Sequence, residues 1–569
     1  MHKIIKFFDI ANINENEMNK PLLESTLNNN ASFKIKLLVI LLLGIGFRLF
    51  QYFYNRSLWM DEVYLCSSFT HLGYLDLATQ NLDYDQKAPI GFLWMVKLMV
   101  DQFGYNEMSL RLIPLFSGMI SLFVFSTVCK SILTQHGRII AMVIISFSPA
   151  LIYHSVEIKQ YSTECLATVL CLYLFTIYEN NNEWQKKILW GIFGGILVWF
   201  SFSVIFILAG LAVGLTVNSF IKRDWQRLKF NMLPFSIWLL SFITNYLLFT
   251  HKHAESQWIV YFFKVYENFM PLFPHTIGQL KWFPKNFFDM LDYPLGLYIN
   301  LKGIVQSDVI KILMLPIIPG LIFFCGIFSL FKYHRKYFYS LIMPVILMCA
   351  ASGIYLYPLV ERFWVFIAPI FIIFIAVGSE YLQKLIKSKK FLWVLTLLLL
   401  IAPIVQSTYL IIEPQNFYVH KKSYEKESLL YIDNNFIAGD AVYNYWNNTP
   451  GYNVYKHIYD FRYKAIQGSD FRSSSKNLED YNNNLKNDFK KFKGCKRVWL
   501  VFNNQFLTDI GDKVDDPLWY YKNNMSPNDN LIQQLSLFAR PISKQIKKDI
   551  TIYLFESFDD NSKLSSSRD

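Results

Sequence analysis

The chain has 569 residues, of which 53% are hydrophobic and only 17% are charged, and its mean hydropathy is +0.24. This composition is too apolar for an ordinary soluble globular protein and indicates a membrane protein. The net charge of +12 does not indicate a nucleic-acid-binding protein, because the basic residues lie in short clusters between long apolar runs. The seven cysteines form no CxxC pair and lie mostly in apolar runs, so they predict neither a disulfide framework nor a zinc site.

The N-terminal residues 1–33 are polar and rich in asparagine, without the apolar core and cleavage site of a signal peptide, and we expect a cytoplasmic tail. Apolar runs long enough to cross a bilayer follow up to residue 411. We predict about eleven membrane-spanning helices. They cover residues 34–53, 109–129, 139–154, 163–179, 187–201, 203–220, 231–250, 309–331, 338–357, 362–382 and 391–411.

The positions of Lys and Arg predict the orientation of these helices. With the N-terminus inside, every short inner loop is rich in basic residues, whereas the short outer loops hold Lys159 and Arg362, each beside an acidic residue. Residues 89–104 are apolar, but they are few and include Lys97. A crossing there would invert every later loop, so we predict an interfacial helix on the outer face.

Three regions are expected outside the bilayer. Residues 54–108 and 251–308 are long outer loops within the transmembrane region 34–411. Residues 412–569 are polar, with the strand-like segments GDAVYNYW and KRVWLVF and the helix-like segment NLIQQLSLF. The predicted fold is therefore a polytopic α-helical membrane protein with an interfacial helix and a C-terminal soluble α/β domain.

The first candidate functional residues are the adjacent carboxylates Asp61 and Glu62, just after the first helix. Two carboxylates side by side at a membrane surface repel each other. This repulsion and partial desolvation raise the pKa of at least one of them toward the range useful for a general base. Acidic residues are also common in the first turn of a surface helix, where they interact with the helix dipole. On position alone, this structural interpretation of the pair is favoured.

Two cationic candidates follow in the same outer loop and at its end. Lys87 precedes Pro89, which begins the interfacial helix, and a helix N-terminus beside a lysine suits an anionic phosphate. Arg111 opens the next span. Either side chain could instead contact lipid headgroups at the interface.

The remaining candidates lie in two later outer turns. Glu157, Lys159, Tyr161 and Glu164 fall within eight residues, and a continuous helix would place Glu157, Tyr161 and Glu164 on one face. Arg362 begins a span without further charge until its far end. Internal salt bridges or interface anchoring would explain each group alone. Together they supply acids and cations on one side of the membrane, which suits a phosphate leaving group and a hydroxyl that must be deprotonated.

The order and spacing of these residues resemble the membrane glycosyltransferases of the GT-C superfamily, in particular the protein mannosyltransferase and lipid A aminoarabinose transferase group. The resemblance covers roughly residues 35–411. It rests on the acidic pair after the first helix, the K-x-P turn, the arginine opening the next span, the outer E-x-K-x-Y turn and the late Y-P and R-F motifs.

The resemblance implies an inverting transfer of a sugar from a polyprenyl-phosphate donor to a glycan, lipid or protein acceptor on the outer side. By this likeness Asp61 is the general base with Glu62 beside it, and Lys87 and Arg362 contact the lipid phosphate. Arg111 matches the arginine of the second span. The family pattern differs at Glu164 and also at Gln86, where the aminoarabinose enzymes carry a glutamate implicated in metal contact, so a divalent cation stays open.

The alternative is a transporter or flippase of an amphiphilic substrate, or a scaffold that binds glycans without chemistry. Transporters usually place ionisable side chains near the middle of the bilayer, whereas this sequence places them at one rim. The enzyme is therefore the favoured interpretation. The composition, rich in Asn and Lys, is typical of an AT-rich bacterial genome and suggests an inner membrane with the C-terminal domain in the periplasm.

Overall fold

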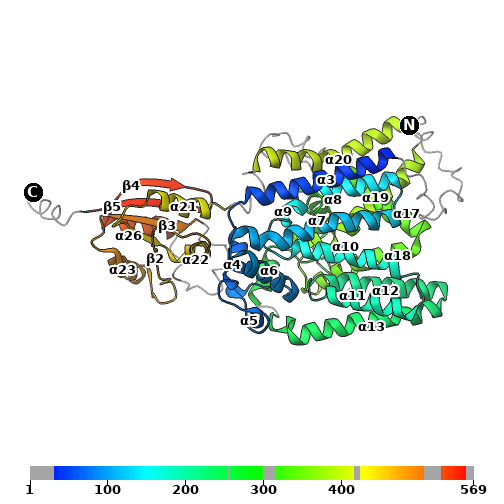
Figure 1. Cartoon of the computed structure of the whole chain (residues 1–569), viewed down its shortest axis with the longest axis horizontal. Helices are drawn as coiled ribbons and strands as arrows, with labels where there is room; N and C mark the ends of the chain where they lie inside the picture. The colour runs from blue at the N-terminus through cyan, green and yellow to red at the C-terminus, as the bar shows by residue number, and fades with distance from the viewer. Residues whose placement is uncertain are drawn as a thin grey trace, which may run out of the picture.

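The computed structural model describes residues 31–253, 257–298, 316–386, 388–414, 423–504, 519 and 527–558. These residues form a helical bundle, followed by a small mixed sheet with helices packed on it (Figure 1). The predicted fold class, a polytopic helical membrane protein with a C-terminal α/β region, is confirmed. The predicted cytoplasmic tail lies almost entirely outside the described residues, as do residues 254–256 and 299–308 of the second outer loop and the start of the predicted span 309–331.

Each of the predicted spans contains a helix. These helices are α3 (Ala31–Tyr54), α7 (Glu107–Ile132), α8 (Gln135–Phe147) with α9 (Pro149–His154), α10 (Tyr161–Tyr178), α11 (Trp184–Leu197), α12 (Val204–Lys222), α13 (Trp225–Leu248), α17 (Ile317–Tyr333), α18 (Arg335–Gly353), η5 (Glu361–Ile367) with α19 (Ala368–Leu385), and α20 (Lys389–Ile412). Within the described part of the chain, 7 helices are long and apolar enough to cross a membrane, and α8 and α17 are shorter apolar helices. By length and composition the chain is a multi-pass membrane protein.

Two interruptions in the helices have local causes. The predicted span 139–154 divides into α8 and α9 because Pro149 lacks an N–H, and the Ser148 hydroxyl accepts from the N–H of Leu151 at 3.3 Å. A second break separates α11 from α12, where the Ser201 hydroxyl accepts from the N–H of Val204 at 3.0 Å. Both breaks lie close to the candidate residues described below.

Glycines allow α17 and α19 to pack closely. A Cβ atom at Gly326 would lie 1.8 Å from the Phe374 carbonyl oxygen, and one at Gly378 would lie 1.9 Å from the Ile322 carbonyl oxygen. Only glycine fits such an approach between two membrane helices. This packing fixes α19, and therefore the residues at its start, against the bundle.

The two long loops that the sequence predicts on the outer side form short helices. The first contains α4 (Met60–Ser68), α5 (Tyr74–Thr79), η3 (Asp83–Asp85) and α6 (Ile90–Phe103), and α6 coincides with the predicted helix at 89–104. The second contains η4 (Thr250–His253), α14 (Gln257–Val265) and α15 (Ile277–Asp292). Helices α4, α5 and α6 lie at the end of the bundle that faces the sheet (Figure 1).

The C-terminal region contains α21 (Glu425–Asn435), β1 (Ala441–Asn444), η8 (Trp446–Asn448), α22 (Thr449–Ile458), β2 (Ile466–Gln467), α23 (Leu478–Phe489), η9 (Lys490–Phe492), β3 (Arg497–Asn503), α26 (Pro527–Ser536), β4 (Ala539–Ile546) and β5 (Ile550–Ser557). The strand order is β2-β1-β3-β5-β4. Strand β1 pairs in parallel with β2 and β3, whereas β5 pairs antiparallel with β3 and β4. The strands and the helix predicted here from local pattern are present.

The C-terminal region shares a hydrophobic core with the first outer loop. One cluster of buried side chains contains Leu58 and Val63 from the outer loop together with Leu429 and Tyr455 from α21 and α22. Burial of such apolar surface is the main favourable term in packing. The sheet region is therefore packed directly against the segment that carries Asp61.

Candidate functional site

Asp61 and Arg362 form an ion pair that joins the first turn of α4 to η5. The Arg362 Nη1 atom lies 2.5 Å from the Asp61 Oδ2 atom, and both side chains are about one quarter exposed. Asp61 lies in the first turn of α4 and Arg362 in η5, just before α19. The structure thus brings together the predicted base and the predicted late arginine in a position that solvent reaches.

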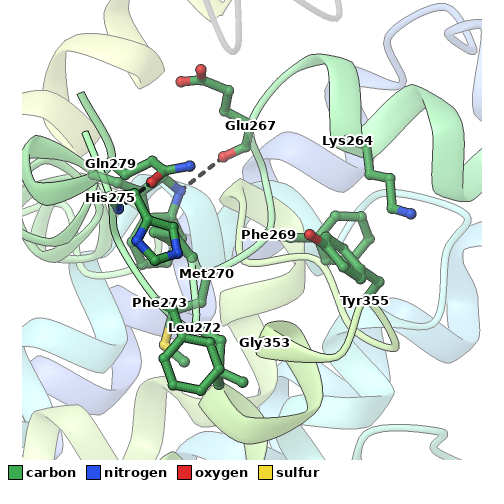
Figure 2. A pocket seen from close by; sticks show the side chains of 12 residues that line it. Lys264, Glu267, Phe269, Met270, Leu272, Phe273, His275, Gln279, Gly353 and Tyr355 are labelled. Carbon is green, nitrogen blue, oxygen red and sulfur yellow. Dashed lines mark hydrogen bonds between the residues drawn. The ribbon is translucent and has the colours of Figure 1, made fainter. Parts of the chain in front are cut away.

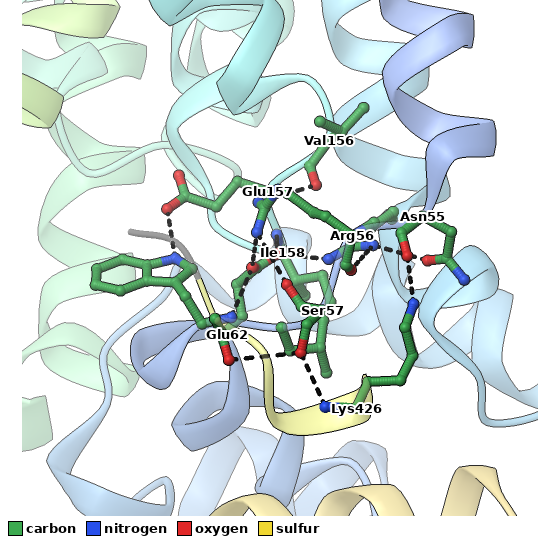
Figure 3. Close-up of polar contacts among 12 residues, drawn as sticks. Asn55, Arg56, Ser57, Glu62, Val156, Glu157, Ile158 and Lys426 are labelled. Carbon is green, nitrogen blue, oxygen red and sulfur yellow. Dashed lines mark hydrogen bonds and ion pairs between the residues drawn. The ribbon is translucent and has the colours of Figure 1, made fainter. Parts of the chain in front are cut away.

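Glu62, the neighbour of Asp61, points the other way and is completely buried. Its carboxylate accepts from Arg56 at 2.7 Å and from the backbone N–H of Ile158 at 2.9 Å (Figure 3). It also accepts from the N–H of Trp59 at 3.2 Å, which caps α4. The helix-capping interpretation therefore applies to Glu62, whereas the Asp61 side chain stays about one quarter exposed.

Arg111 is only 1% exposed, and its guanidinium group lies 3.5 Å from the Glu62 carboxylate. It donates to the Asn55 side chain at 2.8 Å and to the Arg56 carbonyl at 2.9 Å. These contacts tie the start of α7 to the segment before α4. Arg56 and Arg111 thus both pair with the Glu62 carboxylate, which holds the first turn of α4 in place.

Arg56 was not identified from the sequence, although it immediately precedes the Ser57–Glu62 motif. Burial alone would lower the pKa of Arg56, but the Glu62 carboxylate, with Tyr153 and Glu157, raises it above its usual value. Its charge is therefore permanent and compensates Glu62. A basic residue next to an acidic helix start is the signal that could have indicated this pairing.

Glu157 lies in the turn before α10 and is fully buried. Helix α10 begins only at Tyr161, so Glu157 lies in the predicted turn and the continuous helix that would place Glu157, Tyr161 and Glu164 on one face does not form. The Glu157 carboxylate instead accepts from the Trp59 indole at 2.9 Å and lies 2.5 Å from the His154 Nδ1 atom. This contact brings the third candidate segment to the start of α4.

His154 is a second residue that the sequence did not single out as functional. Its other ring nitrogen, Nε2, contacts the hydroxyl of Tyr293 at the end of α15. The second outer loop is thereby connected to Glu157 through one buried imidazole. Because Tyr293 lies 139 positions away, no local pattern could have predicted this contact.

Lys159 follows Glu157 by two residues, in the turn before α10. It is 5% exposed, donates to the Gln86 side chain and interacts electrostatically with Asp61, Arg362 and Glu157. Burial lowers the pKa of Lys159 below its usual value of 10.5, and the Asp61 carboxylate opposes this shift. The neighbouring Lys87 is partly buried, at the turn that Gln86 joins to Lys159.

The start of α6 is less available to an anion than expected. The N–H of Gly91 donates to the Trp199 carbonyl at 2.8 Å, in the break between α11 and α12. A Cβ atom at Gly91 would lie 2.8 Å from the Phe200 ring, so the two segments are in close contact. The Gly91 N–H is therefore already occupied, and Lys87 stays the predicted anion-binding side chain of this turn.

Tyr161 and Glu164 lie in the first turn of α10, and each is 5% exposed. The Tyr161 ring packs edge-on against His154, with ring centroids 5.0 Å apart, and against Phe363 at 6.3 Å. Glu164 interacts with Ser203 at the start of α12. Tyr161 therefore lines the cluster, whereas Glu164 joins α10 to the neighbouring helix break.

The connected side chains carry a surplus of positive charge. Among the described residues that these ion pairs, hydrogen bonds and electrostatic interactions link to Asp61 or Glu62 there are four cations and three carboxylates, which leaves one positive charge when all are ionised. They are Arg56, Arg111, Lys159 and Arg362, and Asp61, Glu62 and Glu157. A carboxylate among excess cations suits an anionic substrate next to a group that accepts a proton.

A cavity of about 580 Å³ lies between the second outer loop and the end of α18 (Figure 2). Lys264 lies 4.1 Å from the Tyr355 ring centroid, and Phe263 packs against Phe363, the residue after Arg362, at 5.5 Å. A mixed aromatic and polar lining of this volume is typical of ligand sites. The lining residues are Lys264, Glu267, Phe269, Met270, Pro271, Leu272, Phe273, His275, Gln279, Trp282, Gly353 and Tyr355.

No metal site is evident among the residues described. No group of three or more His, Cys, Asp or Glu side chains within the described ranges is arranged to hold a metal ion.

Comparison with solved structures gives similar folds at low sequence identity. ArnT from Cupriavidus metallidurans in the apo state is 12% identical, with a TM-score of 0.49 over 90% of this chain and 97% of that chain. The same protein bound to undecaprenyl phosphate gives 11% and 0.48 over 92% and 97%. The Archaeoglobus fulgidus oligosaccharyltransferase in the apo form gives 10% and 0.46 over 84% of this chain and 70% of that chain.

No protein-family model matches the sequence, and no curated protein matches it.

Proposed function

We propose that this chain is an inverting glycosyltransferase that moves a sugar from a polyprenyl-phosphate donor to an acceptor at the outer face of the membrane. The observation that carries the proposal is the ion pair of Asp61 and Arg362, partly exposed, beside the buried cation Lys159. A proton acceptor and two phosphate-binding cations are the groups that this transfer requires.

In the proposed reaction the acceptor hydroxyl attacks the anomeric carbon of the sugar. The new bond between oxygen and carbon forms as the bond between carbon and phosphate oxygen breaks, with inversion at the carbon. Asp61 takes the hydroxyl proton, a contribution of roughly 10²–10⁴-fold in general base catalysis. The ion pair supports this role because it requires the carboxylate in its charged form, which is the form that accepts a proton.

The leaving polyprenyl phosphate is already an anion, so it needs cations and no proton donor. Arg362 and Lys159 supply these charges, and Lys87 contacts the phosphate or the sugar from the turn before α6. When the donor binds, its phosphate competes with Asp61 for the Arg362 guanidinium, whose planar fork suits phosphate oxygens. Arg362 therefore pairs with the general base before the donor binds and with the phosphate leaving group afterwards.

The acceptor approaches, in this proposal, from the cavity between the second outer loop and α18. Phe263 supports this assignment, because its ring packs both against Phe269, which lines the cavity, and against Phe363, the residue after Arg362. We further propose that the active side is extracytoplasmic, in a plasma membrane with the N-terminus in the cytoplasm. We also propose that the chain divides into a transmembrane domain, residues 34–411, and a C-terminal domain, residues 412–569.

A transporter without chemistry is the alternative. Asp61 lies in the first turn of α4, Glu157 precedes α10 and Arg362 precedes α19. Transporters usually gather their ionisable groups where helices are broken near the middle of the membrane. The placement of this cluster at helix ends supports the enzyme.

The deciding experiment incubates the purified full chain with a panel of polyprenyl-phosphate sugars and scores the release of polyprenyl phosphate. We expect release with at least one donor, and none with Asp61→Asn. If no donor is consumed while the protein moves labelled polyprenyl-phosphate sugar across vesicles, the transporter is correct instead.

A further inference from the structure

The segment just before α4 is held by a tyrosine of the C-terminal region. Tyr455 of α22 is completely buried, and its hydroxyl accepts from the backbone N–H of Leu58 at 2.7 Å. The same hydroxyl lies 3.1 Å from the Ser57 hydroxyl. Two consecutive residues before the Asp61 turn are therefore fixed by one side chain that lies 397 residues later than Leu58.

Lys426 at the start of α21 makes a second attachment to the same segment (Figure 3). Its backbone N–H donates to the Ser57 hydroxyl at 3.1 Å, and its ammonium group donates to the Asn55 carbonyl. The ammonium group also lies 3.7 Å from Glu107, which accepts from the Tyr459 hydroxyl at 2.9 Å. Two helices of the C-terminal region, α21 and α22, thus contact the segment that precedes α4.

The attached segment, residues 55–58, leads directly into the helical turn that carries Asp61. Asn55 has a φ of +47°, a left-handed conformation that costs energy unless contacts hold it. Arg56 follows and pairs with Glu62, and Asp61 lies only three residues after Leu58. A shift of this backbone would move the carboxylate relative to Arg362, which belongs to another element.

We propose that Tyr455 and Lys426 are positioning residues that orient α4 so that Asp61 faces Arg362, which makes the C-terminal α/β region a part of the active unit. This proposal deepens the proposed function and rests on it. Neither residue touches the reacting atoms. Their effect passes through the backbone of residues 55–58, which is buried at Ser57 and Leu58.

Tyr455→Phe is the sharpest variant, because it removes one oxygen and keeps the ring that packs in the shared core. The buried N–H of Leu58 then loses its partner, and the cost falls on this segment. Tyr452→Phe is the matched control. Tyr452 lies on the same helix, is 4% exposed and accepts from the N–H of Ala465 at 2.8 Å, a bond inside the C-terminal region.

Two measurements on the purified full chain test the proposal. Hydrogen–deuterium exchange follows the peptide that covers residues 55–65, and steady-state kinetics give kcat and the donor KM. We expect Tyr455→Phe to increase exchange of this peptide and to lower kcat about three- to tenfold, the value of one hydrogen bond, with donor KM changed less than about twofold. Tyr452→Phe is expected to leave both readouts as in the wild type.

The proposal is overturned if Tyr455→Phe leaves the exchange of residues 55–65 unchanged, or if an active wild type and this variant have equal kcat. It is also overturned if both tyrosine variants lower kcat equally, since the effect would then be general destabilisation. Increased exchange in a protein that consumes no donor would reject the proposed function and retain the attachment. If Tyr455→Phe does not fold, Lys426→Gln takes its place with the same criteria.

Discussion

Arg362 and Asp61 lie 301 positions apart in the chain, yet their side chains form an ion pair of 2.5 Å between the guanidinium and the carboxylate. The pair joins the first outer loop to the start of α19. It also separates the roles of two adjacent carboxylates, because Asp61 meets Arg362 at the surface while Glu62 is buried against Arg56 and Arg111. The predictions below follow from this division.

Asp61→Asn is expected to abolish sugar transfer with little loss of stability. The asparagine keeps the size of the side chain but cannot accept the acceptor proton, so a loss of roughly 10²–10⁴-fold is expected. Because the Asp61 side chain is about one quarter exposed, its ion pair with Arg362 is partly screened by solvent and adds little to stability. Transfer rate and thermal unfolding in detergent check the two parts, and a variant with full activity would remove Asp61 as the base.

Arg362→Ala and Lys87→Ala are expected to weaken use of the lipid donor. Loss of a phosphate-binding cation raises the donor KM, and loss of charge stabilisation on the leaving group lowers kcat. Arg362→Lys should recover only part of the effect, because an ammonium group cannot bind two phosphate oxygens in the arginine geometry. Unchanged donor kinetics in both alanine variants would contradict the phosphate roles.

Glu62→Ala is expected to act on folding first. The variant leaves the buried guanidinium groups of Arg56 and Arg111 without their carboxylate, and breaking a buried pair in this way typically costs about 3–5 kcal/mol. We expect poor yield and a lower unfolding temperature than for Asp61→Asn. If Glu62→Ala is as stable as the wild type and inactive, Glu62 takes part in the reaction directly.

Lys159 is expected to set an alkaline limit on activity. Burial lowers the pKa of this lysine below 10.5, so the buried side chain loses its proton at a lower pH than a free lysine does. Below its folded pKa the charge is present and activity is constant with respect to this group, and activity falls as pH rises through that pKa. Lys159→Arg should move the limit to higher pH. Lys97→Arg, an exchange at the Lys97–Asp101 pair on α6, is the control that should leave it in place.

Trp282→Ala is expected to raise the acceptor KM and to leave the donor KM unchanged. The indole lines the cavity and donates to the Glu267 carbonyl at 2.8 Å, so its loss removes part of the cavity wall. Trp393→Ala on α20 is the matched control, since that indole is 74% exposed and lies outside the cavity. If Trp282→Ala raises the donor KM as much as the acceptor KM, the cavity is not a site specific to the acceptor.

Much of the architecture follows from local sequence. The lengths of the apolar runs predict where helices lie, because a membrane helix must satisfy its own backbone over a fixed thickness. The helix α6 and the strands β1 and β3 are recognisable for a similar reason, since their patterns repeat within a few residues. At Glu157 the local pattern predicted a turn and left its continuation as a helix open, and the structure has the turn.

The sequence by itself determined which kinds of side chain gather near the outer ends of the helices. Only the tertiary structure decided that Asp61 faces Arg362 while Glu62 is buried, that His154 connects to Tyr293, and that Tyr455 holds Leu58. The physical reason is distance along the chain. Periodicity reports the neighbours of a residue within a few turns, whereas these partners meet only after the bundle and the C-terminal sheet have packed on each other.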